Sequence, residues 1–322
     1  MSVIKGYQIQ GILAKGGMAT IYLALQESLQ RHVALKVLSP KLDTSILEHF
    51  LDESRIIASL KHPNIIPVFD VGRVGMHFYH AMEYIEGGDL ELKITQGIDH
   101  NTALEIVIEL SDALHLVHSK GIIHGDIKPA NIVFRSDGSP VLTDFGISKR
   151  TTALTEVDQE ENIFASPSYA SPELMLGEQF DKTVDIYSLG IVLYEMLIGE
   201  KPFQGKTQAE MVTSHIQDTI PSLPKEMQAL QPLINGMLAK NKNDRISDAS
   251  VISTFIKKYL RDHPSAKQKA IIQDVSMEGE VSLEYISDKT HKTNITSPRI
   301  LLPLLLILLS ANIAFALWYF LF

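Results

Sequence analysis

Two short runs of the chain combine the side-chain types that move a phosphoryl group. Residues 124–131 read His-Gly-Asp-Ile-Lys-Pro-Ala-Asn, and residues 144–146 read Asp-Phe-Gly. Phosphoryl transfer needs a carboxylate that orients the attacking hydroxyl, a cation on the γ-phosphate of ATP and oxygen ligands for Mg²⁺. The residues that fit these roles, in that order, are Asp126, Lys128, and the pair Asn131 and Asp144.

A strand and a helix upstream would position the nucleotide for these groups. Residues 33–36 read Val-Ala-Leu-Lys, an apolar run that predicts a strand ending in Lys36. Residues 50–60 carry apolar side chains at helical spacing, with Asp52 and Glu53 adjacent to each other. Neighbouring helix positions point about 100° apart, so only one of these two carboxylates can face Lys36.

In their order along the chain, these runs resemble the motifs of the eukaryotic-like protein kinases. Residues 171–173 read Ser-Pro-Glu where the family has Ala-Pro-Glu, and residues 185–190 match the start of the central helix of its large lobe. Arg245 matches the arginine that pairs with the glutamate of that Pro-Glu, here Glu173. Residues 171–173, 185–190 and Arg245 distinguish protein kinases from small-molecule kinases, which usually lack them. The resemblance covers about residues 5–260 and is nearest to the bacterial Ser/Thr kinases.

The resemblance implies roles for individual positions. Lys36, locked by Glu53, would hold the α- and β-phosphates of ATP. Met82 would be the gatekeeper of the adenine pocket, and the segment from Glu83 to Ile85 would offer backbone groups to adenine. The nucleotide positions implied in this way are Leu13, Gly16, Gly17, Ile21, Ala34, Lys36, Glu53, Met82, Glu83, Ile85 and Val133.

The fold implied by the resemblance is the α+β, two-lobed protein-kinase fold. A small β-rich lobe with one helix is expected over about residues 1–85, and a mostly helical lobe over about residues 86–262. ATP with Mg²⁺ or Mn²⁺ would lie in the cleft between them. The expected partners are proteins that present Ser or Thr hydroxyls.

The glycine-rich loop departs from the family pattern. G-x-G-x-x-G-x-V falls on Ala14, Gly16, Ala19 and Ile21, with Gly17 as an extra glycine. Glycine is favoured in such a loop because backbone N–H groups must approach phosphates closely. The two alanines therefore predict weaker ATP binding, unless the loop is already adapted to them.

Two further departures concern the catalytic loop and the activation segment. Gly125 stands where many relatives carry an arginine that pairs with a phosphorylated residue, so loop phosphorylation is expected to matter less here. Residues 165–167 read Ala-Ser-Pro in place of Gly-Thr-Pro. Ser166 retains the hydroxyl that usually bonds Asp126 and Lys128. Together with Lys128, it points by resemblance to Ser/Thr rather than Tyr specificity.

The composition fits an ordinary globular chain. The 322 residues are 45% hydrophobic and 21% charged, with a net charge of −9. Nucleic-acid binding usually shows a basic footprint, so this acidic balance gives no reason to expect it. The absence of cysteine excludes disulfides and thiolate metal sites and suits a reducing compartment.

The last residues, 300–322, carry no charged side chain. As a helix they would extend about 34 Å, against about 30 Å of membrane hydrocarbon. This favours a transmembrane helix over a buried C-terminal helix. Asn312 is a polar residue within the stretch that could bond a second helix, which leaves a homodimer open.

The polar residues 263–299 predict a juxtamembrane tether between the kinase domain, residues 1–262, and the span. Lys289, Lys292 and Arg299 flank the span on the domain side. By the positive-inside rule the kinase domain would lie in the cytoplasm, with one C-terminal anchor in the membrane.

Two other functions fit the same sequence. A pseudokinase would use this fold as a membrane-tethered binding or scaffold module, and the altered glycine loop and Gly125 keep that hypothesis open. Such proteins usually lose at least one of four residues, all of which are present: Lys36, Asp126, Asn131 and Asp144. A small-molecule kinase would lack the anchor formed by residues 171–173 and Arg245.

Overall fold

The computed structural model describes residues 4–16, 19–39, 44–75, 77–145 and 167–264. The side chains of residues 44–49 and 52–53 lie outside this description, as do residues 146–166 and 265–322. The chain up to His263 forms one compact unit. The predicted span and all but the first two residues of the predicted tether, 263–299, fall outside the described residues. Within those residues, no helix is both long and apolar enough to cross a membrane.

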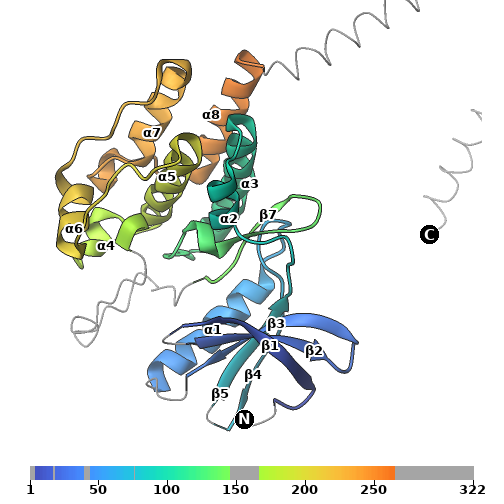
Figure 1. Cartoon of the computed structure of the whole chain (residues 1–322). Helices are drawn as coiled ribbons and strands as arrows, with labels where there is room; N and C mark the ends of the chain where they lie inside the picture. Colours follow the sequence, from blue (N-terminus) through green and yellow to red (C-terminus); the bar gives the residue numbers. More distant parts are fainter. Residues whose placement is uncertain (1–3, 17–18, 40–43, 76, 146–166, 265–322) are drawn as a thin grey trace, which may run out of the picture. The chain divides into compact units, whose positions relative to one another are not determined.

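The N-terminal lobe is a five-stranded antiparallel sheet with one helix (Figure 1). The strand order is β1-β2-β3-β5-β4, because helix α1 separates β3 from β4 in the chain and β5 then pairs with both. The elements are β1 (Tyr7–Lys15), β2 (Ala19–Gln26), β3 (Arg31–Leu38), α1 (Thr44–Ser59), β4 (Val68–Val74) and β5 (His77–Glu83).

The position of each strand follows from its side chains. Residues 78–82 of β5 are all buried, and Val33, Ala34 and Leu35 of β3 are buried in succession. Strands covered on both faces need such continuous burial, and β3 and β5 are the central strands. β1 is mostly exposed and forms an edge.

The C-terminal lobe is built around two long helices, α3 and α5. Nearly every residue of α5 is buried, as expected for a helix that is hydrophobic all round. Gly199 ends α5 at φ 85°, a left-handed backbone that glycine adopts without strain. The helices are α2 (Leu90–Gln96), α3 (His100–Ser119), α4 (Pro172–Met175), α5 (Thr183–Ile198), α6 (Gln208–Gln217), α7 (Gln231–Met237) and α8 (Ala249–Asp262).

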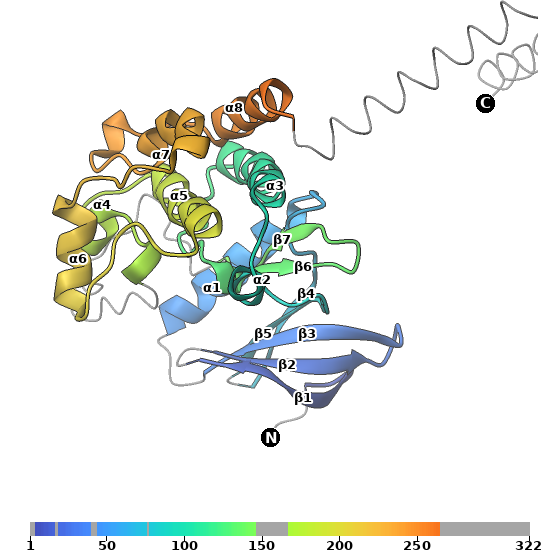
Figure 2. The ribbon, with the colours of Figure 1, turned by 45° about the horizontal axis from the view of Figure 1, so that its top comes forward.

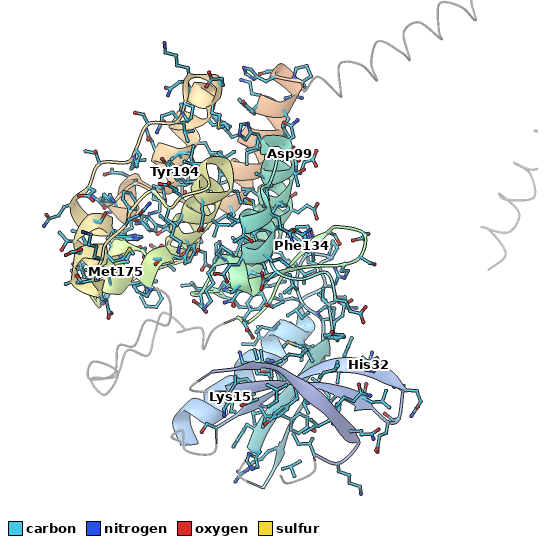
Figure 3. The ribbon with its side chains drawn as sticks, viewed as in Figure 1. Lys15, His32, Asp99, Phe134, Met175 and Tyr194 are labelled. Carbon is cyan, nitrogen blue, oxygen red and sulfur yellow. The ribbon has the colours of Figure 1, made fainter. Side chains whose placement is uncertain are left out.

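A short hairpin, β6 (Ile132–Phe134) and β7 (Pro140–Leu142), lies between the sheet and the helices (Figure 2). Phe134 of β6, labelled in Figure 3, is almost fully buried there. One apolar cluster joins Ala34 and Met82 of the sheet to residues of α3, α5 and the hairpin. The two-lobed α+β fold that the sequence predicted is therefore confirmed for the described residues.

Candidate active site

Three polar residues of the catalytic loop form one hydrogen-bonded cluster. Lys128 Nζ donates to Asp126 Oδ2 over 2.7 Å. Asn131 Nδ2 donates to the same Oδ2 over 2.9 Å and to the backbone oxygen of Asp126 over 2.8 Å. Pro129, with its fixed φ, begins the short 3₁₀ turn Pro129–Asn131 that brings Asn131 back over the loop. The structure thus brings together three of the four residues that the sequence assigned to the chemistry.

The amide orientation of Asn131 decides which atom it can offer to a ligand. Both contacts on Asp126 are made by oxygens that accept, so the amide nitrogen of Asn131 faces them. The carbonyl oxygen Oδ1 is then left for other contacts. An amide oxygen and the Asp144 carboxylate are hard ligands of the type that Mg²⁺ prefers, with phosphates and water completing its shell. The residues present fit a Mg²⁺ ion.

Asp144 pairs with Lys36 from the other lobe. The Nζ of Lys36 lies 2.9 Å from Asp144 Oδ1. Burial of the Asp144 carboxylate would raise its pKa, but the Lys36 cation and its hydrogen bond outweigh burial and hold the pKa of Asp144 below its ordinary value. Asp144 is therefore an anion at neutral pH. Its φ of 49° is unusual for a residue other than glycine.

Asp185, at the start of α5, fixes the backbone of the catalytic loop. Its carboxylate accepts hydrogen bonds from the backbone N–H groups of His124 and Gly125, each over 2.8 Å, and from His118 Nε2 over 2.7 Å. Burial would raise the pKa of this 1%-exposed residue, but the bonds from His118 and Gly125 hold its pKa below the ordinary value. Asp185 is the first residue of the run 185–190 that resembles the start of the family's central helix.

Gly125 has a backbone requirement of its own. Its φ is 75°, in the left-handed region that residues with a Cβ rarely adopt. An added Cβ would find open space, so conformation rather than packing favours glycine there. The sequence reasoning considered only the charge that Gly125 lacks and missed this point.

Arg245 and Glu173 form a buried, two-pronged ion pair. The two guanidinium nitrogens lie 2.7 and 3.0 Å from the Glu173 oxygens, and one of them also donates to the backbone oxygen of Thr183 over 3.0 Å. The pair ties the short helix α4 to the start of α5. It matches the anchor that the sequence predicted. Ser166, which was expected to bond Asp126 and Lys128, lies outside the described residues.

Most of the predicted adenine-side residues share one apolar surface. Ala34 and Met82 are buried and are paired across β3 and β5. Ile21, Ile85 and Val133 pack against the same cluster. An apolar surface with a few polar groups beside it is what a nucleotide base needs.

The β1–β2 turn is less fully described. Gly16 donates its N–H to the backbone oxygen of Ala19 over 2.9 Å, whereas Gly17 lies outside the described residues. Leu13 is 43% exposed. Ala14 lies in β1 opposite Ile21, with a negative φ like Ala19. Neither alanine occupies a conformation that calls for glycine, which favours the alternative that the loop is adapted to alanine.

The predicted Lys36–Glu53 pair remains a prediction. The backbone of Glu53 lies in α1, but its side chain and that of Asp52 are outside the described ones. The partner that the structure gives Lys36 is Asp144, which sequence spacing could not indicate, because the two residues come from different lobes.

Residues 83–88, the linker between the lobes, are held by contacts that the sequence did not predict. Glu83 accepts hydrogen bonds from Arg135 over 3.2 and 2.6 Å, and its own N–H donates to Pro67 over 3.0 Å. The backbone group that Glu83 can offer to adenine is therefore its carbonyl. Gly87 and Phe134 add a backbone bond of 2.9 Å, and a Cβ on Gly87 would lie 2.2 Å from the Phe134 oxygen. The only sequence signal was the Gly-Gly pair after β5.

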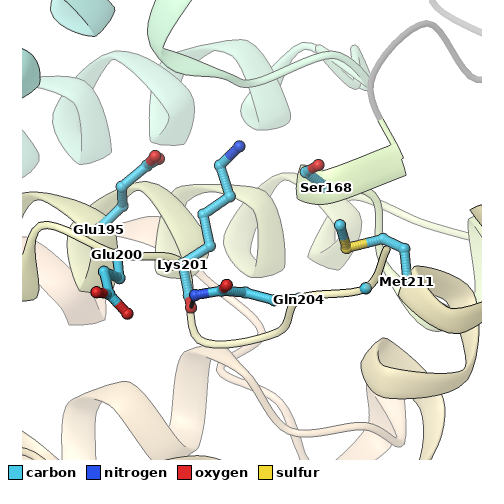
Figure 4. A pocket seen from close by; sticks show the side chains of 7 residues that line it. Ser168, Glu195, Glu200, Lys201, Gln204 and Met211 are labelled. Carbon is cyan, nitrogen blue, oxygen red and sulfur yellow. Dashed lines mark hydrogen bonds between the residues drawn. The ribbon is translucent and has the colours of Figure 1, made fainter. Parts of the chain in front are cut away.

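A hollow of about 470 Å³ lies apart from the catalytic cluster, at the end of α5. Glu195, Lys201 and Ser168 extend into the same space (Figure 4). Burial raises the pKa of Glu195, which accepts a 2.8 Å hydrogen bond from the Tyr169 hydroxyl. No motif in the sequence marked this hollow.

Comparison with known proteins agrees with this geometry. The protein kinase domain family matches residues 7–260. The chain belongs to the protein kinase family. The matched range contains every described element from β1 to α7 and most of α8.

Three similar curated proteins are bacterial serine/threonine kinases. The chain is 36% identical over 256 residues to the serine/threonine-protein kinase PknB of Mycobacterium leprae, covering 76% of this chain and 41% of that protein. It is 34% identical over 280 residues to PrkC of Bacillus subtilis, covering 84% and 43%. A probable PknB of Lactococcus lactis is 35% identical over 259 residues, covering 78% and 41%. The chain therefore groups with the bacterial Hanks-type Ser/Thr kinase family, and it spans about two fifths of the length of these relatives.

Proposed function

We propose that the chain transfers the γ-phosphate of ATP to Ser or Thr hydroxyls of proteins. The observation that carries this proposal is the cluster of Asp126, Lys128 and Asn131 within hydrogen-bond distance of one another. The 2.9 Å pair of Lys36 and Asp144 adds to it. The divalent ion, when bound, supplies neutralisation of phosphate charge.

Each side chain then has a defined task, and Lys128 and Asn131 have two. The partly exposed carboxylate of Asp126 orients the substrate hydroxyl and accepts its proton, held by Lys128 and Asn131 in a fixed direction. Lys128 also places a cation beside the transferred phosphoryl group. Asn131 Oδ1 and the Asp144 carboxylate would hold the metal ion. Lys36 positions the α- and β-phosphates, assisted by Glu53. Most of the rate gain comes from positioning and charge stabilisation.

The adenine ring would occupy the apolar surface formed by Ile21, Ala34, Met82 and Val133. The carbonyl of Glu83 and the backbone of Ile85 would bond its edge. Leu13, Gly16 and Gly17 would cover the nucleotide from the β1–β2 turn.

The test is transfer of labelled phosphate by the full chain to itself or to a generic basic protein, with Mg²⁺ or Mn²⁺. Asp126→Asn and Lys36→Met should each remove at least about 99% of the rate. Exposed Asp99→Asn is the matched control for the charge change. A wild-type chain that binds Mg-ATP and transfers nothing would establish the pseudokinase alternative.

We further propose one transmembrane helix at residues 300–322, with the tether at residues 263–299 and the kinase domain, residues 1–262, in the cytoplasm. The support is the uncharged sequence and the cations Lys289, Lys292 and Arg299 before it. The wild-type chain should resist alkaline carbonate extraction from membranes. Ile307→Arg with Ile313→Arg should release it, because each charge costs about 3 kcal/mol at the helix centre. The control is Ile307→Leu with Ile313→Leu, which keeps both side chains apolar.

A further inference from the structure

His80 of β5 and Ser54 of α1 form a buried polar pair between these two elements. No step proposed above uses this pair. Ser54 Oγ lies 3.1 Å from His80 Nδ1. The two residues are 2% and 7% exposed. Phe50, one helical turn before Ser54, stacks on the His80 ring with centroids 5.0 Å apart. Two side chains of the same helix face therefore contact one residue of β5.

His80 is also the direct neighbour of Lys36 in the sheet. The two residues are paired across β3 and β5, so their side chains emerge on the same face. α1 contacts this face through the Ser54–His80 bond. The residue before Ser54 is Glu53, which is predicted to lock Lys36. A shift of α1 that breaks the 3.1 Å contact therefore also moves Glu53 relative to Lys36.

The imidazole is uncharged in this position. Burial, with a contribution from the Lys36 cation, lowers the pKa of His80 to about 3. A neutral ring can bond the Ser54 hydroxyl without repelling Lys36 or competing for the Asp144 carboxylate. A buried Ser54 hydroxyl without a partner is unfavourable, so its bond to Nδ1 favours one position of α1 over others, although Nε2 of the ring has no partner among the described residues.

We propose that His80 is a positioning residue for phosphoryl transfer, which acts by holding Ser54 and thus fixing α1 beside Lys36. This inference rests on the proposed kinase activity. Neither His80 nor Ser54 needs to touch ATP. Their proposed role is to assemble the nucleotide-binding side of the site through the position of α1.

The test compares amides at the two ring-nitrogen positions, in the full chain. His80→Asn places an amide near the Nδ1 position and can still bond Ser54, whereas His80→Gln places it near Nε2. We expect Ser54→Ala and His80→Gln to lower kcat/KM for ATP at least about fivefold, with KM for the protein substrate within about twofold of wild type. His80→Asn should retain most of the rate. Exposed Ser59→Ala, on the same helix, is the control.

A double-mutant cycle supplies the second readout. Ser54→Ala combined with His80→Gln should cost no more than about twofold beyond either single change, because each removes the same bond. Additive losses, or an Asn variant as impaired as Gln, would overturn the proposal. So would losses that simply follow the melting temperature across all variants.

The same variants separate this inference from the proposed function. If the wild-type chain transfers no phosphate, the kinase activity fails, and equilibrium binding of Mg-ATP becomes the measurement. Weaker binding of at least about fivefold for Ser54→Ala and His80→Gln, but not for His80→Asn, would still support the positioning role. Equal affinity in all variants would exclude it.

Discussion

The catalytic loop and the β1–β2 turn differ in what holds them. The loop backbone at His124 and Gly125 is bonded to Asp185, a buried carboxylate from a helix about sixty residues away. The turn is held by strand pairing and by the bond from Gly16 to Ala19. Because the conformation of the catalytic loop depends on bonds to a distant element, few substitutions of the residue that makes those bonds can preserve it. Local pairing tolerates side-chain changes, which explains why alanines are acceptable in the turn.

The largest effect is expected at Asp185. Asp185→Asn replaces one acceptor oxygen by an NH₂ group that faces N–H donors, so hydrogen bonds to the loop are lost. We expect the free energy of unfolding to fall by about 3 kcal/mol and the transfer rate by at least about a hundredfold. Denaturant unfolding and steady-state kinetics measure the two effects. Asp99→Asn is the control, because asparagine caps a helix as well as aspartate does. A loss below about 1 kcal/mol would show that the loop does not depend on the brace.

The next effect is expected at the linker. A Cβ on Gly87 would lie 2.2 Å from the Phe134 oxygen, so Gly87→Ala must displace the linker from β6. We expect a cost of about 2 kcal/mol in the free energy of unfolding and weaker ATP binding. Gly11→Ala is the matched control, since its added Cβ meets no atom within 4 Å. Equal stability of the two variants would mean that the linker is free to adjust.

The Lys36–Asp144 pair should show a pH signature. Because the folded-state pKa of Asp144 lies below the ordinary 3.8, its ionised form stabilises the fold above that pH. The contribution disappears as pH falls through the lowered folded-state pKa. We expect Asp144→Asn to cost about 1 kcal/mol at neutral pH, and the difference from wild type to shrink below about pH 4. Urea unfolding across this range measures it, with exposed Glu178→Gln as control. A difference that stays constant with pH would contradict the pairing.

The smallest effect is expected in the turn. Ala14→Gly and Ala19→Gly should each cost about 0.5–1 kcal/mol of stability, because glycine adds freedom to the unfolded chain. Neither alanine has a positive φ, so no strain is relieved. ATP affinity, measured by equilibrium titration, should be unchanged or weaker. Tighter binding would show that the turn is impaired by its alanines, as the family pattern alone suggests.

Sequence motifs predicted the fold and the grouping of Asp126, Lys128 and Asn131, because those residues lie within one short loop whose spacing carries the geometry. The anchor between Arg245 and Glu173 was also predictable from the family pattern. Contacts such as Arg135 with Glu83, or Ser54 with His80, could not be predicted. The two residues of each contact lie in different elements. The spacing of residues within one element does not indicate which residues of another element will lie beside them.

The attachment of the linker to β6 also has a mechanical consequence. Gly87 and Gly88 are bonded to Phe134, and the Glu83 side chain is bonded to Arg135, so both ends of the linker are tied to the end of β6 and the residue after it. Rotation of the sheet relative to the helices must then be absorbed by the backbone torsions of residues 84–86, or it must break the Arg135 contact. The stretch of linker between these contacts is residues 84–86, and we expect its backbone torsions to change when the nucleotide cleft opens with the Arg135–Glu83 ion pair intact.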